Sequence, residues 1–272
     1  MKRLINQYPD RTLYVMLGAL PFILIFIAYI MASDARLEEN AHDKLLPSLT
    51  SMGTALDKLA LQPSKRSGEY LFWLDTGSSL TRLGMGIGIA AVIGLLFGII
   101  NGAIPYVRAN LSPFITAVSL VPPLAVLPIL FIVFGLGELS KVVLIAIGIT
   151  PFIIRDLQNN VMELPAEQMI KAQTLGASSW LVIIRVILPQ VLPRLIGALR
   201  LSLGAAWLFL IAAEAIASTD GLGYRIFLVR RYLAMDVILP YVVWITFLSF
   251  FADYLLKKLS ERLFPWFHAG DK

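Results

Sequence analysis

Six long apolar stretches alternate with polar segments along the chain. They cover residues 12–31, 80–103, 112–136, 139–155, 195–218 and 236–256. A helix needs about 20 residues to cross the hydrocarbon core of a bilayer, and each stretch reaches or approaches that length. The pattern therefore predicts an all-α integral membrane protein with six transmembrane helices.

The segment 156–194 fits neither a membrane span nor an ordinary loop. Gly176, Pro189 and Pro193 break it, yet it contains more aliphatic and aromatic residues than a solvated loop. We interpret it as two short amphipathic helices outside the bilayer, joined at Gly176. We expect Pro189 to end the second helix, because proline lacks an amide hydrogen and clashes with the preceding turn.

The apolar side of these two helices has two possible partners. A helix that lies among lipid headgroups usually carries lysine and arginine on its polar face. The polar positions here are mostly glutamine, serine and threonine. This composition favours a groove on another protein as the partner.

Composition agrees with a membrane protein and excludes several functions. Of the 272 residues, 58% are hydrophobic and 15% are charged, whereas about a quarter are charged in soluble domains. The chain has no cysteine, which excludes disulfides, thiolate metal sites and a cysteine nucleophile. His42 and His268 lie outside the apolar stretches, so we expect no metal site. The net charge of +5 suits anionic lipid, and no basic cluster mixed with aromatic residues indicates nucleic-acid binding.

The distribution of lysine and arginine predicts the orientation. Twelve lie on the side of the N-terminus and nine on the other side, mostly in the acidic loop 32–78. By the positive-inside rule, both termini are expected in the cytoplasm. The first stretch follows Lys2, Arg3 and Arg11, but it is too long for the core of a signal peptide. Within the outer loop, residues 46–59 have leucine and methionine at steps of three and four, which predicts an amphipathic helix.

Glu214 is a carboxylate near the outer end of an apolar stretch. Such a group is costly in a membrane and usually faces a cavity or a charged partner. We expect it to pair with a basic residue such as Arg225 or Arg230, or to take part in gating. Direct contact with a transported solute is the remaining alternative.

Pro122, Pro123 and Pro128 lie close together in the stretch 112–136. Proline frees backbone carbonyls, which a membrane tolerates only where they face protein or a water-filled path. These prolines either kink the helix for packing or line a translocation pathway together with Glu214.

Other polar and small residues in the spans have simpler interpretations. Arg200 is expected to extend toward the cytoplasmic surface, and Asp253 to pair with Lys257 four residues on. Glycines in one span are expected to allow close helix packing. No lysine accompanies them, so they form no phosphate-binding loop. These glycines are Gly84, Gly86, Gly88, Gly94 and Gly98.

A family resemblance lies in the segment after the fourth stretch. The spacing Ala172-x3-Gly176-x9-Val186-x-Leu188-Pro189 resembles the cytoplasmic signature E-A-A-x3-G-x9-I-x-L-P of permease subunits of binding-protein-dependent ABC importers. Ile170 and Lys171 replace the first two residues of that signature. The segments "LVPPLAVLPILFIVFGLGELSKVVLI" and "AAEAIASTDGLGYRI" are similar to the nitrate, sulfonate and taurine subgroup, and more weakly to relatives encoded beside urea carboxylase.

The resemblance covers most of residues 75–265 and implies a type I ABC importer permease fold. It divides the chain into an N-terminal span with an outer segment (1–78), a permease core (79–265) and a tail (266–272). It implies a non-catalytic, multi-pass subunit of the bacterial inner membrane that works within a complex: a homodimer with two ATPase subunits and a substrate-binding protein. ATP and Mg²⁺ would bind to the ATPase subunits. The residues expected in the ATPase contact are Ala172, Leu175, Gly176, Ala177, Ser178, Trp180 and Pro189.

Two other functions compete with ATP-driven import of a small polar or anionic solute. An ion-coupled secondary transporter would need several carboxylates or histidines in the membrane, and the spans offer essentially Glu214 and Asp253. An intramembrane enzyme would need a constellation such as histidine with aspartate, and no such pairing is visible in the spans.

Overall fold

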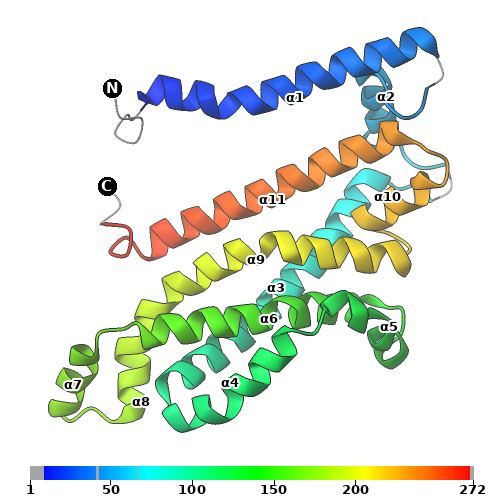
Figure 1. The fold of residues 1–272 in the computed structure, drawn as a ribbon. Coiled ribbons are helices and arrows are strands. Elements are labelled where there is room, and N and C mark those ends of the chain that lie inside the picture. Colours follow the sequence, from blue (N-terminus) through cyan, green and yellow to red (C-terminus); the bar gives the residue numbers. More distant parts are fainter. Residues whose placement is uncertain (1–8, 41–42, 66, 270–272) are drawn as a thin grey trace.

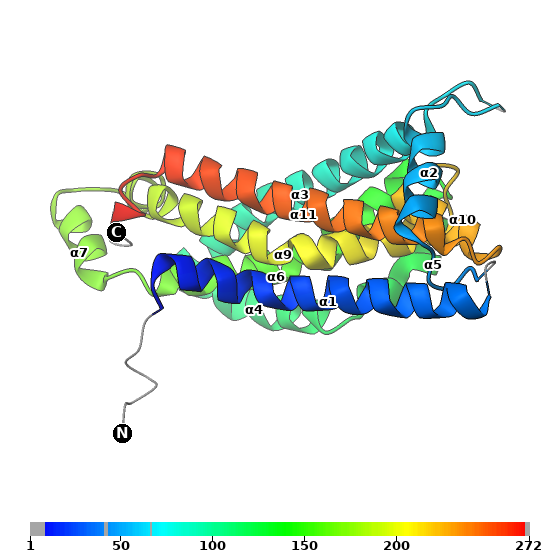
Figure 2. The same ribbon diagram turned by 90° about the horizontal axis from the view of Figure 1, so that it is seen from above.

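The chain is a bundle of helices in the computed structural model, which describes residues 9–40, 43–65 and 67–269. Long helices run side by side, and shorter helices lie at both ends (Figures 1 and 2). The predicted all-α class is confirmed. The elements are α1 (Arg11–Glu39), α2 (Leu49–Ala60), α3 (Leu71–Ala103), α4 (Pro105–Ser119), α5 (Pro123–Phe134), α6 (Glu138–Met162), α7 (Ala166–Thr174), α8 (Ser179–Val182), a π-helical turn (Ile183–Ile187), α9 (Leu188–Ile216), α10 (Leu222–Arg230) and α11 (Met235–Leu263).

Some residues used in the sequence analysis lie outside the described part. They are Lys2, Arg3 and His42, together with Arg66 and Lys272, two of the basic residues counted for the orientation. The helix α3 begins at Leu71, so the predicted division between residues 78 and 79 falls inside a continuous helix.

Four helices of the described chain are long and apolar enough to cross a membrane: α1, α3, α11 and the continuous helix Ser179–Ile216. The pair α4 and α5 could form a fifth span, but its two halves are bent by 93°. The apolar stretch 112–136 is therefore divided between two helices, and the kink that its prolines allowed is a sharp break. Pro122 precedes Pro123 at the break, and each proline both removes an amide donor and disfavours helical backbone in the residue before it. The count of six spans stays a prediction.

The centre of the bundle is the contact between α3 and α6. Small residues recur every four positions on α3, and branched residues recur at the same spacing on α6. A Cβ atom on Gly94 would lie 2.5 Å from Cγ2 of Ile153, so the α3 backbone lies directly against these side chains. The small residues are Gly86, Ala90, Gly94, Gly98 and Gly102, and the branched ones are Ile145, Ile149, Ile153, Leu157 and Val161.

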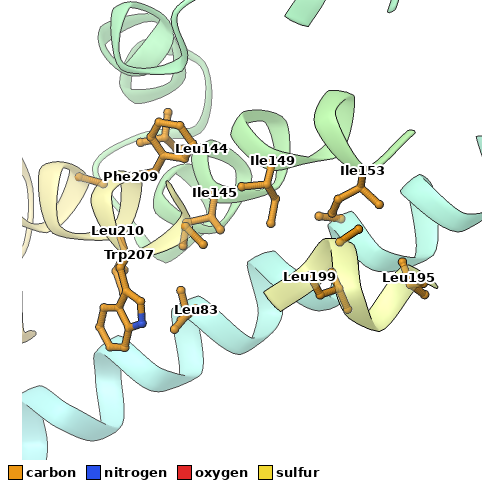
Figure 3. Packing of buried hydrophobic residues seen from close by; sticks show 14 of the residues in the cluster. Leu83, Leu144, Ile145, Ile149, Ile153, Leu195, Leu199, Trp207, Phe209 and Leu210 are labelled. Atoms are coloured by element: carbon orange, nitrogen blue, oxygen red, sulfur yellow. The ribbon is translucent and has the colours of Figure 1, made fainter. Parts of the chain in front are cut away.

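Figure 3 shows Ile145 of α6 beside Leu83 of α3, with Trp207 and Leu210 of α9 close to both. The three helices thus share one apolar core. The packing expected of the α3 glycines is confirmed for three of the five, whereas nothing lies within 4 Å of the Cβ positions of Gly84 and Gly88.

The outer segment ties α1 to the rest of the chain. Tyr29 donates a hydrogen bond to the Pro47 carbonyl at 2.6 Å, and the Ser33 hydroxyl donates to the Leu46 carbonyl at 2.9 Å. The predicted amphipathic helix is confirmed as α2, whose first turn is capped by Ser48. Along the membrane span itself α1 buries almost no side chain.

Arg200 and Asp253 pair between α9 and α11. Nε of Arg200 lies 2.7 Å from Oδ1 of Asp253, and Nη2 lies 2.9 Å from Oδ2. The expected local pair of Asp253 with Lys257 is therefore wrong, and the extension of Arg200 toward the cytoplasmic surface stays a prediction. A guanidinium matches both oxygens of a carboxylate, and this two-point contact is stronger than a single ammonium contact.

Candidate functional site

The chain between α6 and α9 forms two short helices at one end of the bundle (Figure 1). Gly176 follows α7 with φ of +84°, a left-handed conformation that glycine adopts at little cost. The Ala177 amide returns to the Ala172 carbonyl at 3.0 Å, which closes the end of α7. Ser178 then caps α8 by accepting a hydrogen bond from the Leu181 amide at 3.3 Å. The predicted bend at Gly176 is confirmed.

The second helix does not end at Pro189. It continues through the π-helical turn into α9, so that one helix runs from Ser179 to Ile216. A π-helical turn widens the helix just where the proline ring would meet the preceding turn. Pro189 follows this turn directly, as the second residue of α9.

The tip of this segment presents apolar side chains to solvent. Leu175 is 88% exposed and Trp180 is 66% exposed. Ala172 and Ala177, by contrast, pack against the core of the bundle. Exposed apolar surface of this kind is typical of a contact with another protein. The expected contact residues therefore comprise an inner pair that holds the tip and an outer group that is available to a partner.

A buried network of charged side chains lies toward the other end of α3. Arg82 is 2% exposed, and all five of its N–H donors are used. Nη1 donates to Glu214 at 2.7 Å and to the Asp220 carbonyl at 3.0 Å. Nη2 donates to Asp220 Oδ1 at 2.6 Å and to Glu138 Oε1 at 2.8 Å, while Nε donates to the second oxygen of Glu138. One arginine thus joins α3, α6, α9 and the loop before α10.

Glu214 is fully buried at the centre of this network. Besides the Arg82 contact, it accepts hydrogen bonds from the Ser79 hydroxyl at 2.8 Å and 3.0 Å. The Gly223 amide donates to its second oxygen at 2.8 Å. A buried carboxylate is stable only when its charge is paired and its oxygens are hydrogen-bonded, and both conditions hold here.

Asp75 is a second fully buried carboxylate, one turn before Ser79 on α3. It accepts hydrogen bonds from the Gly221 amide at 3.0 Å, from Arg225 Nε at 2.8 Å and from the Tyr241 hydroxyl at 3.2 Å. Two buried carboxylates therefore fasten the chain after α9 onto α3 and α11.

The expected partner of Glu214 was wrong, although pairing with a basic residue was right. Arg225 pairs with Asp75 instead, and Arg82 takes the place that we assigned to Arg225 or Arg230. Sequence reasoning sought a partner close in the chain, whereas Arg82 is 132 residues away. A usable signal was present: Asp75 and Arg82 are two helical turns apart on an otherwise apolar helix, with a serine on the same face.

The loop before α10 fits closely around these charges. Gly221 has φ of +116°, and a Cβ atom there would lie 2.5 Å from Cδ of Glu214 and 2.7 Å from Nη1 of Arg82. Partial burial tends to raise the pKa of the neighbouring Asp220, but hydrogen bonds from Ser78 and Arg82 outweigh it and hold that pKa below its usual range. Asp220 is therefore ionised at neutral pH.

A cavity of about 540 Å³ lies between the α4–α5 break and α6. Of the predicted pathway residues, Pro123 lines it, and Pro122, Pro128 and Glu214 do not. The pathway role of all four stays a prediction. The cavity is bordered by Val118, Ser119, Leu120, Val121, Pro123, Val126, Ile147, Gly148, Pro151, Phe152, Arg155, Asp156 and Asn159.

Comparison with known sequences finds a single protein family over most of the chain. Residues 90–265 match the family described as "Binding-protein-dependent transport system inner membrane component". The taurine transport system permease protein TauC of Escherichia coli (strain K12) is 39% identical over 194 residues, which are 71% of this chain and 70% of that protein.

Two further relatives are named for other solutes. The putative aliphatic sulfonates transport permease protein SsuC of Bacillus subtilis (strain 168) is 31% identical over 74% of this chain and 72% of its own length. The bicarbonate transport system permease protein CmpB of Synechococcus elongatus is 30% identical, over 81% of this chain and 78% of its own length.

Solved structures share the fold. A chain of the inward-facing MetNI methionine ABC transporter has a TM-score of 0.62 at 20% identity, covering 74% of this chain and 97% of its own. A chain of a bacterial ABC transporter that imports the acidic polysaccharide alginate has a TM-score of 0.63 at 15% identity, covering 93% and 96%. The expected fold, that of a type I ABC importer permease, is confirmed.

Proposed function

We propose that this chain, which belongs to the family of binding-protein-dependent transport system inner membrane components, is the membrane-spanning permease subunit of an ATP-driven importer. Its cargo is a small polar or anionic solute such as taurine, another sulfonate, nitrate or bicarbonate. The relatives named for taurine, aliphatic sulfonates and bicarbonate support this class of cargo. A binding protein on the outer side delivers the solute to the permease.

The observation that carries the proposal is the exposed apolar tip formed by α7 and α8. Leu175 and Trp180 project from a segment that Gly176 bends back toward the bundle. In the proposed assembly, two copies of the chain each place this tip in a groove of an ATPase subunit. Closure of the ATPase pair around ATP and Mg²⁺ draws the tips together and opens the bundle outward. The chain itself carries out no covalent chemistry.

The contact relies on shape and apolar surface. Ile170, at the position where the family signature has glutamate, is exposed on α7. An aliphatic side chain adds to the apolar surface of the tip and offers no charge to the partner.

Charge substitutions at the tip test the proposal. Leu175→Asp and Trp180→Asp are expected to abolish co-purification of the ATPase subunits and ATP-dependent uptake in proteoliposomes, because a carboxylate cannot be buried unpaired. The matched control is Gln173→Asp, which adds the same charge to an exposed polar position of α7. Permease variants that reach the membrane and still hold the ATPase would contradict the proposal, as would uptake that persists with a hydrolysis-deficient ATPase.

A further inference from the structure

The cavity between the α4–α5 break and α6 is lined by apolar residues and by a few polar and charged ones. Its volume of about 540 Å³ lies within the range of about 300–1,000 Å³ that is usual for small-molecule sites. Val118, Val126 and Phe152 belong to its apolar wall. Arg155 and Asn159, one turn apart on α6, supply polar groups.

Arg155 has donors available for a ligand. Its Nη1 donates to the Ser119 hydroxyl at 3.1 Å. Within residues 9–40, 43–65 and 67–269, no carboxylate forms a salt bridge with it. A guanidinium has five N–H donors, so one neutral hydroxyl leaves most of them without a protein acceptor in the described chain. Arg82, with all five donors used, shows the contrasting arrangement of a structural arginine.

Acceptors lie next to this arginine. Asp156 also borders the cavity and receives a hydrogen bond from Asn160 at 3.1 Å, which leaves further lone pairs on its carboxylate. Pro151 has no amide hydrogen, so the Ile147 carbonyl in the cavity wall lacks its usual helical donor. Arg155 and Asp156 both border the cavity, so its lining offers one cationic and one anionic group.

From this arrangement we infer that the cavity binds a small zwitterionic sulfonate during import, with its sulfonate on Arg155 and its ammonium group near Asp156. The inference rests on the proposed function and narrows its solute class. A guanidinium donates two parallel hydrogen bonds to a planar or tetrahedral oxyanion, and the apolar wall accommodates the methylene groups. Taurine is the simplest aminoalkyl sulfonate of this class.

Thiol labelling tests the charge of the cavity without transport. The chain has no cysteine, so Ser119→Cys introduces a unique thiol beside Arg155. Methanethiosulfonate ethylsulfonate, an anion, is expected to react at least about tenfold faster than its trimethylammonium counterpart, because the thiol would take the place of the Ser119 hydroxyl beside the Arg155 guanidinium, which attracts anions. Added taurine is expected to slow this reaction. Both reagents react with the same thiolate. A change in the ionised fraction of the thiol therefore alters both reaction rates equally and leaves their ratio unchanged.

Two variants complete the labelling experiment. Thr116→Cys, one turn earlier on α4 and outside the cavity lining, is expected to show no preference for the anionic reagent. Adding Arg155→Ala to Ser119→Cys is expected to remove the preference. An equal rate ratio for the Ser119→Cys thiol with and without Arg155, or no protection by taurine, would overturn the inference.

Uptake by the reconstituted complex tests the solute class. Arg155→Ala is expected to reduce uptake of both taurine and ethanesulfonate about tenfold or more, whereas Asp156→Asn reduces taurine uptake alone. Arg108→Ala, which removes a charge of α4 outside the cavity lining, is the control and is expected to retain uptake. Equal losses of both solutes in Asp156→Asn would overturn the zwitterion assignment. Failure of the unaltered complex to import any solute would instead contradict the proposed function. The labelling experiment would still show whether the cavity beside Arg155 binds taurine.

Discussion

Arg82 and Glu214 carry opposite charges, and both side chains are buried. Moving each charge out of water costs several kcal/mol, and their attraction offsets that cost only when every donor and acceptor is matched. The match is complete for Arg82, whose five donors reach three acidic residues. The network is therefore stable as a unit and sensitive to the loss of any member.

Removal of the central arginine is the first test of that view. Arg82→Met is expected to lower the free energy of unfolding by about 3–5 kcal/mol, because it leaves the buried Glu214 carboxylate without a counter-charge. Arg200→Met is the matched control, since the Arg200–Asp253 pair is more exposed and is expected to contribute about 0–1 kcal/mol. Thermal unfolding in detergent measures both. Equal losses in the two variants would contradict the argument.

Gly221 tests the fit of the loop around the network. Gly221→Ala is expected to destabilise the protein through both its positive φ and the 2.5 Å approach to Glu214. Gly135→Ala isolates the backbone effect, because Gly135 also has a positive φ, +75°, but nothing within 4 Å of its Cβ position. Both glycines combine positive φ with extended ψ, a region that other residues rarely adopt, and we expect about 1–3 kcal/mol for the backbone effect alone, with a larger loss at Gly221. A loss at Gly221 no greater than at Gly135 would exclude the steric contribution.

Among the helices, α3 and α6 depend on matched periodicity. Small residues every four positions on α3 place its backbone against branched side chains of α6 at the same spacing. Close approach of this kind supplies van der Waals packing where lipid offers no hydrophobic driving force. The same glycines are poor helix formers, so their use on α3 reflects packing rather than propensity.

A pair of glycine variants distinguishes these two effects. Gly94→Ala is expected to destabilise by about 1–3 kcal/mol, because the added methyl group meets Ile153. Gly88→Ala, with nothing within 4 Å of the Cβ position, is expected to stabilise by about 0.5–1 kcal/mol through helix propensity. Opposite signs in thermal unfolding are the expected result. The same sign in both variants would show that helix contact does not determine the effect.

Across the whole molecule, the apolar tip and the buried network lie toward opposite ends of the bundle, and the cavity lies between the α4–α5 break and α6 (Figure 1). This arrangement suits a permease that couples one end to an ATPase. An ion-coupled transporter would use carboxylates that exchange ions during its cycle. Glu214 and Asp253, the two candidates, are each held by an arginine.

The orientation of the molecule is a prediction at the same scale. With both termini in the cytoplasm, green fluorescent protein fused to either end is expected to fluoresce, and alkaline phosphatase fused there is expected to be inactive. Alkaline phosphatase inserted after Gln62, in the outer segment, is expected to be active. Phosphatase activity at either terminus would contradict the predicted orientation.

The sequence alone determined the helical class, the family resemblance, the short helix α2 and the bend at Gly176. Each of these depends on residues close together in the chain, since periodicity, left-handed backbone and caps act within a few residues. Pro122 and Pro123 also signalled the break between α4 and α5, although the length of the apolar stretch led us to a single span. Local patterns therefore sufficed wherever local backbone geometry controlled the outcome.

Tertiary structure decided which charges meet. Glu214 pairs with Arg82 from α3, and Arg200 pairs with Asp253 from α11. These pairs form because folding brings the helices together, so that each guanidinium lies within hydrogen-bonding distance of a carboxylate. The continuation of the helix past Pro189 likewise depended on a π-helical turn that no propensity indicates. The cavity beside Arg155 exists only because α5 turns away from α4 beside α6. Such contacts join residues far apart in the chain, so the order of residues does not specify them until the helices are packed.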